Sequence, residues 1–232
     1  MISVIIPTYN EERCIVRAVE SVLGQDDGVA FEIVVGDGGS TDATVSLARR
    51  YARVVHSEKG RGAQLNAAAK TATGAIFFFL HAHITLPPGA LAMIERKIDE
   101  EGYDGGGFSN VFSTHNDRIK RLGRVLNGRI RDNDHAGNTI FFGDNGIFVR
   151  RAVFEALGGF KTIPIMEDYD FSKRLRQQYR VVRIGAPRLI VSPRRHVEAG
   201  FVKTRLQWIL IKRLYQLGVS PHVLARWYRD VR

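Results

Sequence analysis

The chain has 232 residues, of which 44% are hydrophobic and 25% are charged, and this composition excludes disordered, collagen-like and coiled-coil proteins. Its 34 Lys and Arg residues exceed its 24 Asp and Glu residues, and the net charge of +10 favours anionic partners such as phosphates, acidic lipids or nucleic acid. Cys14 is the only cysteine, which excludes an intrachain disulfide and a cysteine-based zinc site and predicts a cytoplasmic location.

Short apolar segments and helical repeats alternate over roughly the first ninety residues. The β-branched run at residues 2–6 ends at Pro7 and is typical of a strand buried on both faces. We expect strands at residues 2–6, 31–35, 54–56 and 75–80, and helices at residues 12–23, 42–51 and 61–73. This alternation predicts βαβ units and an α/β fold with a mainly parallel sheet. The apolar run at 75–80 is too short to span a bilayer and no basic leader precedes the first strand, so we expect neither a membrane span nor a signal peptide.

The second half of the chain is less regular, and no linker or repeat separates it from the first half. We expect a helix at residues 90–101, strands at 107–112 and 146–150, and helices at 116–131 and 168–178. Some of these strands should pair antiparallel. The sequence therefore predicts one domain whose second half contributes part of the site.

The C-terminal segment alternates large apolar side chains with basic ones between residues 201 and 217. Trp208 and Leu214, for example, lie among Lys203, Lys212 and Arg213. This pattern predicts a basic amphipathic helix with two possible positions. The apolar stripe packs on the chain's own domain, or it docks on an anionic membrane surface.

Polar loops follow three of the predicted strands, at residues 7–12, 36–42 and 81–83. Ligands bind at the carboxyl ends of strands in parallel α/β sheets, so these loops should line one crevice. The second loop combines glycines with hydroxyl and acidic side chains, which suits close contact with a polar ligand. The same composition is equally typical of a tight turn followed by a helix cap.

Two charged motifs lie at predicted helix starts. Glu167, Asp168 and Asp170 are crowded carboxylates, which stabilise a helix N-terminus and can also provide a general base. Arg61 is flanked by glycines at the start of another helix, where a guanidinium and the helix amides both favour a phosphate.

Several motifs together give a resemblance to a known family. Residues 2–12, ISVIIPTYNEE, and residues 32–42, EIVVGDGGSTD, resemble the nucleotide-sugar half of a family 2 glycosyltransferase with the GT-A fold. Residues 143–150, GDNGIFVR, residues 157–160, LGGF, and the pair at 167–168 resemble its acceptor half. The similarity covers about residues 2–180.

The resemblance also implies the organisation of the chain. The GT-A domain would span residues 1–200, with a nucleotide-sugar half at 1–100, an acceptor half at 101–200, and amphipathic helices at 201–232. Within the family, the motifs GRGAQLN from Gly60 and FLHA from Phe79 are most similar to a small bacterial subgroup associated with arsenosugar biosynthesis.

The same resemblance implies a role for each motif. The residues around the nucleoside would be Pro7, Thr8, Tyr9, Glu11 and Asp37, with Asp37 at the base edge. Arg61 would approach the diphosphate, and Asp168 would take the proton from the acceptor hydroxyl. Asp144, Asn145 and Glu167 would place the acceptor. The implied reaction is an inverting single displacement from a nucleotide-diphosphate sugar, with UDP expected, to a small-molecule or lipid-linked hydroxyl.

His83 stands where the family's metal motif ends in a carboxylate. Three outcomes remain open: His83 is a nitrogen ligand of Mn²⁺, which accepts imidazole more readily than Mg²⁺ does; the site is metal-independent and arginines offset the charge; or the protein binds the nucleotide sugar without turnover. His81 is a second candidate ligand, because it would share a face with His83 on a continuing strand. His196, beside two arginines, is a third candidate.

Two other functions compete with this prediction. A nucleotidyltransferase has a similar crevice, but it should carry a glycine-rich loop where residues 7–10 read PTYN. A nucleic-acid-binding module agrees with the charge, but the sequence contains no recognised nucleic-acid motif, and we expect no nucleic-acid partner. The sequence therefore predicts a cytoplasmic glycosyltransferase, with peripheral attachment to the inner membrane face as an alternative.

Overall fold

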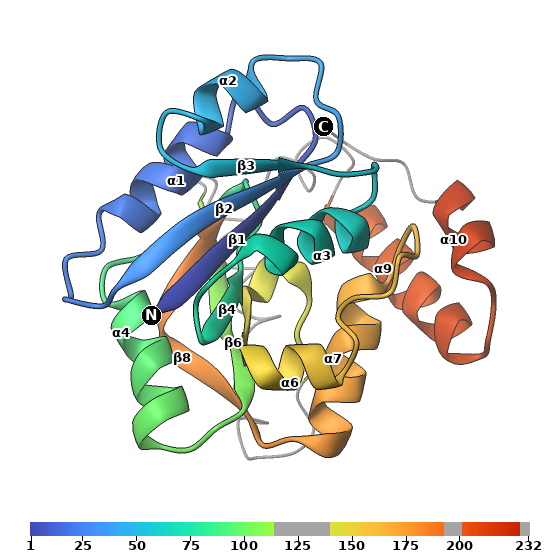
Figure 1. Ribbon diagram of the computed structural model, residues 1–232. Coiled ribbons are helices and arrows are strands. Elements are labelled where there is room, and N and C mark those ends of the chain that lie inside the picture. Colours follow the sequence, from blue (N-terminus) through green and yellow to red (C-terminus); the bar gives the residue numbers. More distant parts are fainter. Residues whose placement is uncertain (114–139, 193–200, 228–232) are drawn as a thin grey trace.

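Eight strands form one mixed sheet in the computed structural model, within the described residues 1–113, 140–192 and 201–227 (Figure 1). Their order is β3-β2-β1-β4-β7-β6-β8-β5. The bounds are β1 Ile2–Thr8, β2 Phe31–Asp37, β3 Arg53–His56, β4 Ile76–Phe79, β5 Ile84–Thr85, β6 Gly105–Phe112, β7 Ile147–Arg150 and β8 Val181–Val191. Strands β1 to β4 are parallel, whereas β7 pairs antiparallel with both β4 and β6. The α/β class with antiparallel pairs in the second half is confirmed.

Helices cover both faces of this sheet (Figure 1). On one face lie α1 Ile15–Leu23, α2 Thr44–Ala48 and α4 Ala90–Glu95, which a π-helical turn η1 Arg96–Glu100 extends. On the other lie α3 Arg61–Thr71, α6 Arg151–Ala156 and α7 Glu167–Gln178. Strand β1 is buried along its whole length, as its apolar run predicts, and its side chains alternate between two cores.

Several elements differ from their predicted bounds. The helix expected at residues 42–51 is shorter, and its N-cap is Ala43 and not Asp42. Asp42 lies one residue earlier, where its Oδ1 accepts a hydrogen bond from the Thr44 N–H at 3.0 Å. The strand expected at 75–80 ends at Phe79, so His81 and His83 lie around a turn and not on a continuing strand. Strands β5 and β8 and helix α6 were not predicted, and the helix expected at 116–131 lies outside the described residues.

The C-terminal segment forms two helices, α9 Phe201–Gln216 and α10 Pro221–Trp227. Ile211 of α9 and Leu224 of α10 are buried against Met166 and Tyr169 at the start of α7. Packing on the chain's own domain is therefore correct for one face of α9. No helix among the described residues is both long enough and apolar enough to cross a bilayer.

Candidate functional site

The loops after β1 and β2 are tied together at the carboxyl end of the sheet. The Gly38 N–H donates to the Thr8 carbonyl at 2.9 Å, and the Asn10 N–H donates to Ser40 Oγ at 2.9 Å. Asn10 returns a bond, since its Oδ1 accepts the Thr41 N–H at 2.9 Å. Asn10 has a positive φ of 55°, a left-handed conformation that asparagine adopts more readily than most other residues. The two predicted nucleoside loops are therefore one structural unit.

Asp37 lies at the centre of this unit and is fully buried. Its Oδ2 accepts the N–H groups of Gly39 and Ser40 at 3.0 and 2.9 Å. Its Oδ1 accepts the hydroxyls of Thr8 and Ser40 at 3.1 and 2.5 Å. These four hydrogen bonds fix the carboxylate of Asp37 and stabilise the turn that follows β2.

The start of α3 approaches the same unit. Gln64 Nε2 donates to the Thr8 carbonyl, and a Cβ at Gly36 would overlap the backbone of Gln64, so α3 and β2 need glycine at this position. The Lys59 ammonium lies 4.0 Å from the centre of the Tyr9 ring. Nearby, the Glu11 N–H donates to Thr44 Oγ1 at 2.8 Å. Pro7, Thr8, Tyr9 and Glu11 thus gather beside a cationic helix start.

Arg61 connects this half of the chain with the other. Its Nε lies 2.7 Å from Oε1 of Glu167, whose side chain is 2% exposed. Burial raises the pKa of Glu167 to about 7; the Arg61 charge opposes this shift and the Asp168 charge adds to it. The second carboxyl oxygen of Glu167, Oε2, accepts no hydrogen bond among the described residues. Arg61, predicted to approach a diphosphate, therefore lies beside a buried carboxyl group.

The three acids at the start of α7 have different surroundings. Asp168 Oδ2 accepts the Gly143 N–H at 2.8 Å, and Asp168 Oδ1 accepts the Tyr169 N–H at 2.6 Å. Burial would raise the pKa of Asp170, but Lys161 and Arg174, each 2.7 Å away, hold that pKa below its usual value. Met166, just before the helix, has φ 71°, a strained conformation that persists where surrounding structure imposes it.

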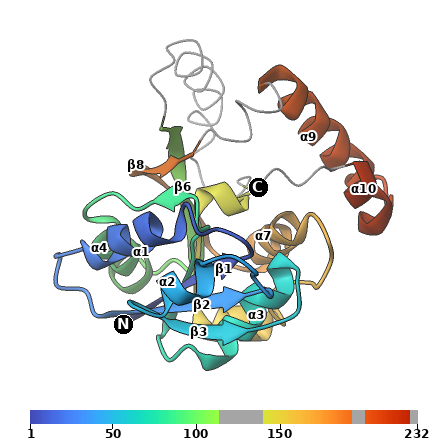
Figure 2. The ribbon, with the colours of Figure 1, turned by 90° about the horizontal axis from the view of Figure 1, so that it is seen from above.

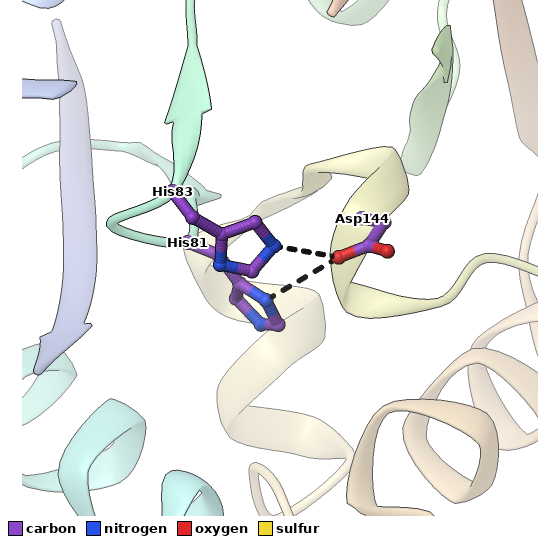
Figure 3. Close-up of side chains that lie close together, drawn as sticks. All are labelled: His81, His83 and Asp144. Atoms are coloured by element: carbon purple, nitrogen blue, oxygen red, sulfur yellow. Dashed lines mark hydrogen bonds and ion pairs between the residues drawn. The ribbon is translucent and has the colours of Figure 1, made fainter. Parts of the chain in front are cut away.

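His81, His83 and Asp144 converge from two loops (Figure 3). His83 Nε2 lies 3.0 Å and His81 Nδ1 lies 3.8 Å from the same oxygen, Asp144 Oδ1. One potential ligand atom from each residue lies within 4.8 Å of the others. Asp144 belongs to the 3-10 turn η2 Gly143–Asn145, directly before β7.

The residues around this His-His-Asp group hold its members in place by packing and by hydrogen bonds. A Cβ at Gly143 would overlap the His81 ring, so glycine lets the ring lie on the turn. Asn110 Nδ2 donates to the Asp144 carbonyl at 2.9 Å, and Asn145 Nδ2 donates to the Phe108 carbonyl at 3.0 Å. Two imidazoles and one carboxylate fit a transition-metal ion such as Mn²⁺ better than Mg²⁺, which prefers oxygen ligands.

Sequence reasoning placed Asp144 with the acceptor and did not group it with the histidines. The antiparallel pairing of β4 with β7 could have revealed this group. The register that joins Phe79 to Ile147 brings the loop after β4 opposite η2. Arg13 and Arg17 were also missed; they line a cavity with His83 at the start of α1. His196 and its neighbouring arginines lie outside the described residues.

Comparison with known proteins gives a consistent result. The family model for "Glycosyl transferase family 2" matches residues 3–158. "Uncharacterized protein MT1568" of Mycobacterium tuberculosis is 31% identical over 223 aligned residues, covering 86% of this chain and 68% of the relative. The "PGL/p-HBAD biosynthesis glycosyltransferase" of the same species is 28% identical over 184 residues, covering 75% of this chain and 69% of the relative.

Two solved structures share the fold. Staphylococcus aureus TarS 1-349, crystallised with UDP-GlcNAc, has a TM-score of 0.64 at 22% identity and covers 82% of this chain. The mannosyltransferase PcManGT of Pyrobaculum calidifontis, in complex with GDP-Man and Mn²⁺, has a TM-score of 0.67 at 24% identity and covers 100% of this chain. This chain spans 58% of the TarS chain and 65% of the PcManGT chain.

Proposed function

Since the chain belongs to glycosyl transferase family 2, we propose that it moves a hexosyl group from a nucleotide-diphosphate sugar to an acceptor hydroxyl, with inversion and with Asp168 as general base. The observation that supports this proposal most strongly is the Arg61–Glu167 ion pair at 2.7 Å. It brings the predicted phosphate contact of the first half to the residue next to the predicted base of the second half. A donor held by the first half would thus face the carboxylate of Asp168.

The nucleoside would bind at the joined loops after β1 and β2. Because the oxygens of Asp37 are committed to the turn, Asp37 would act on the nucleoside site through the shape of residues 38–40. Tyr9 and Glu11 would contact the nucleoside beside it, with Pro7 and Thr8 fixing the end of β1. The cationic groups of Lys59 and Arg61 would face the diphosphate. UDP is the nucleotide we propose, and the similarity to the arsenosugar subgroup stays a prediction.

The transfer step would use Asp168 at the start of α7. The acceptor oxygen attacks the anomeric carbon and its proton passes to Asp168, while the bond from that carbon to the diphosphate oxygen breaks and the nucleoside diphosphate leaves with the electron pair. Each Asp168 oxygen accepts one backbone hydrogen bond and keeps a second lone pair for the proton. Glu167 and Asn145 would help to place the acceptor.

His81, His83 and Asp144 would hold the divalent cation, because two nitrogens and one carboxylate suit Mn²⁺. When bound, such a cation offsets the negative charge of the diphosphate. In that role, Asp144 would act on the donor through the bound cation. It would influence the acceptor only through the η2 turn, to which it belongs.

The test is the Asp168→Asn variant, measured as nucleoside diphosphate release from UDP- and GDP-sugars with Mn²⁺ and with water as acceptor. We expect release to fall by about 10²-fold or more while donor affinity by calorimetry stays within about twofold. The amide has the size of the carboxylate and keeps one of its two backbone hydrogen bonds, but it cannot take a proton. Asp99→Asn changes an exposed carboxylate on η1 and serves as the matched control.

Three outcomes would overturn the proposal. Near-normal release by Asp168→Asn would remove Asp168 as the base. Release of pyrophosphate from nucleoside triphosphates, with no nucleoside diphosphate from any donor sugar, would identify a nucleotidyltransferase. A wild-type chain that binds donors but releases nothing would identify a binding protein without turnover.

A further inference from the structure

The second face of α9 leaves large apolar side chains exposed. Nine large hydrophobic side chains are exposed among the described residues, and six of them belong to α9, α10 and the turn between them. They are Leu206, Ile209, Leu210, Leu217, Val223 and Trp227, called here the C-terminal apolar face. On α9 they follow the spacing of one helical stripe, and Leu217 is 81% exposed. Clustered exposed apolar residues on a folded chain mark an interaction surface.

The opposite face fixes the orientation of α9. Ile211 is 1% exposed, and Trp208 and Leu214 pack with it against the start of α7. Gln216 Nε2 donates to the Tyr169 hydroxyl at 2.7 Å. The helix therefore cannot turn its exposed stripe inward without losing this packing. Figure 2 shows α9 and α10 at one side of the molecule, outside the sheet and the helices that cover it.

The charged residues of this C-terminal segment are all basic. Residues 201–227 contain five Lys and Arg residues and no Asp or Glu. The exposed Arg213 lies in the apolar stripe itself, and Arg226 is exposed on α10. Trp227 adds an aromatic side chain of the kind that favours the interface between lipid and water.

We propose that the C-terminal apolar face docks on the surface of an anionic lipid bilayer. Leucine, isoleucine and tryptophan side chains would enter the interface, and the arginines would lie at the level of the anionic headgroups. Basic residues near such a surface are attracted to the anionic headgroups, so affinity should depend on both salt and lipid charge. No helix of the described residues can span the bilayer, and docking parallel to the surface does not require one.

The position of the face has a consequence that rests on the proposed function. Because α9 packs on Tyr169, docking would bring the start of α7, with Asp168, to the side of the molecule that faces the membrane. The acceptor class that fits is a lipid-linked hydroxyl presented at the bilayer surface.

Vesicle co-sedimentation of the full chain tests the docking without any turnover. Wild type should sediment with phosphatidylglycerol–phosphatidylcholine vesicles at least tenfold more strongly than with phosphatidylcholine alone, and should release as salt rises to about 0.5 M. The triple variant Leu206→Gln, Ile209→Gln, Leu210→Gln should bind at least tenfold less. The pair Arg213→Glu, Arg226→Glu should lose the preference for anionic lipid. Leu23→Gln with Tyr51→Gln, two exposed apolar positions elsewhere, is the matched control.

Circular dichroism and nucleoside diphosphate release without vesicles should be unchanged in the triple variant, which separates lost docking from lost folding or lost activity. The proposal is overturned if wild type ignores anionic vesicles or if the triple variant sediments as wild type does. It is also overturned if wild type dimerises in solution and the triple variant is monomeric, because a second copy then covers the face.

Discussion

Glu167 is a buried carboxyl group whose ionisation should affect stability near neutral pH. Its pKa in the folded chain is raised to about 7 from the usual 4.5, mainly by burial and further by the Asp168 charge, against the attraction of Arg61. A raised pKa means that the folded state binds this proton more tightly than the unfolded state does. The stabilisation of the folded state by protonated Glu167 is therefore complete below about pH 4.5, and it is lost as the pH rises through about 7.

The corresponding prediction concerns Glu167→Gln, whose side chain is neutral at every pH. The difference in melting temperature, variant minus wild type, should rise between pH 4.5 and 7 and level off above it. Differential scanning calorimetry at half-unit pH steps measures this difference. Glu155→Gln, at an exposed carboxylate, is the control and should change stability little. A difference that stays flat or falls with pH would contradict the assigned environment of Glu167.

Residue types at the site could be predicted from the sequence, but their individual surroundings could not. Glu167, Asp168 and Asp170 look alike as neighbours in sequence. Their roles differ because Arg61, Gly143 and Lys161 approach them from other parts of the chain. Such partners are set by tertiary packing, which local patterns do not contain. The proposed base therefore stays a prediction until turnover is measured.

At the scale of elements, the η2 turn connects the proposed base with the candidate metal group. Gly143 donates to Asp168, and the next residue, Asp144, lies beside the histidines. The three-residue turn thus fixes the proposed base and the candidate metal group together.

We predict that Gly143→Ala disturbs both the proposed base and the candidate metal group. The new Cβ would overlap the His81 ring, and overpacking of this kind costs about 1–3 kcal/mol. Denaturant unfolding should show that loss, and calorimetry should show weaker Mn²⁺ binding. Gly24→Ala is the control, since its nearest heavy atom would be the Glu20 carbonyl oxygen at 3.4 Å. Unchanged unfolding free energy and unchanged Mn²⁺ affinity in Gly143→Ala would contradict this packing.

Elements with a strong repeat could be predicted and irregular ones could not. The run in β1 and the helical spacing in α1 gave elements close to those observed. Strand β8 was missed because Gly185, Pro187 and a mixture of exposed and buried positions interrupt its pattern, and its partner β6 supplies the pairing. Strand β5 has two residues and α6 has six, too few for a periodic signal.

At the scale of the whole molecule, α3 joins the two halves of the site. Besides the Arg61–Glu167 pair, Asn66 donates to the Phe160 carbonyl at 2.7 Å and accepts the Phe160 N–H at 3.0 Å. The loops after β1 and β2, which we propose bind the donor, and the start of α7 are therefore held in one arrangement. This preorganisation fits a reaction in which donor and acceptor must meet in line.

The most direct measurement is calorimetric titration of the full chain with UDP, GDP, dTDP and CDP, with Mn²⁺, with Mg²⁺ and after removal of metals by chelation. We predict that UDP binds at one site per chain, at least tenfold more tightly with Mn²⁺ than with Mg²⁺, and that His83→Ala abolishes this difference. If no nucleoside diphosphate binds under any of the three conditions, the chain does not use a nucleotide-sugar donor at this site and the proposed function is wrong.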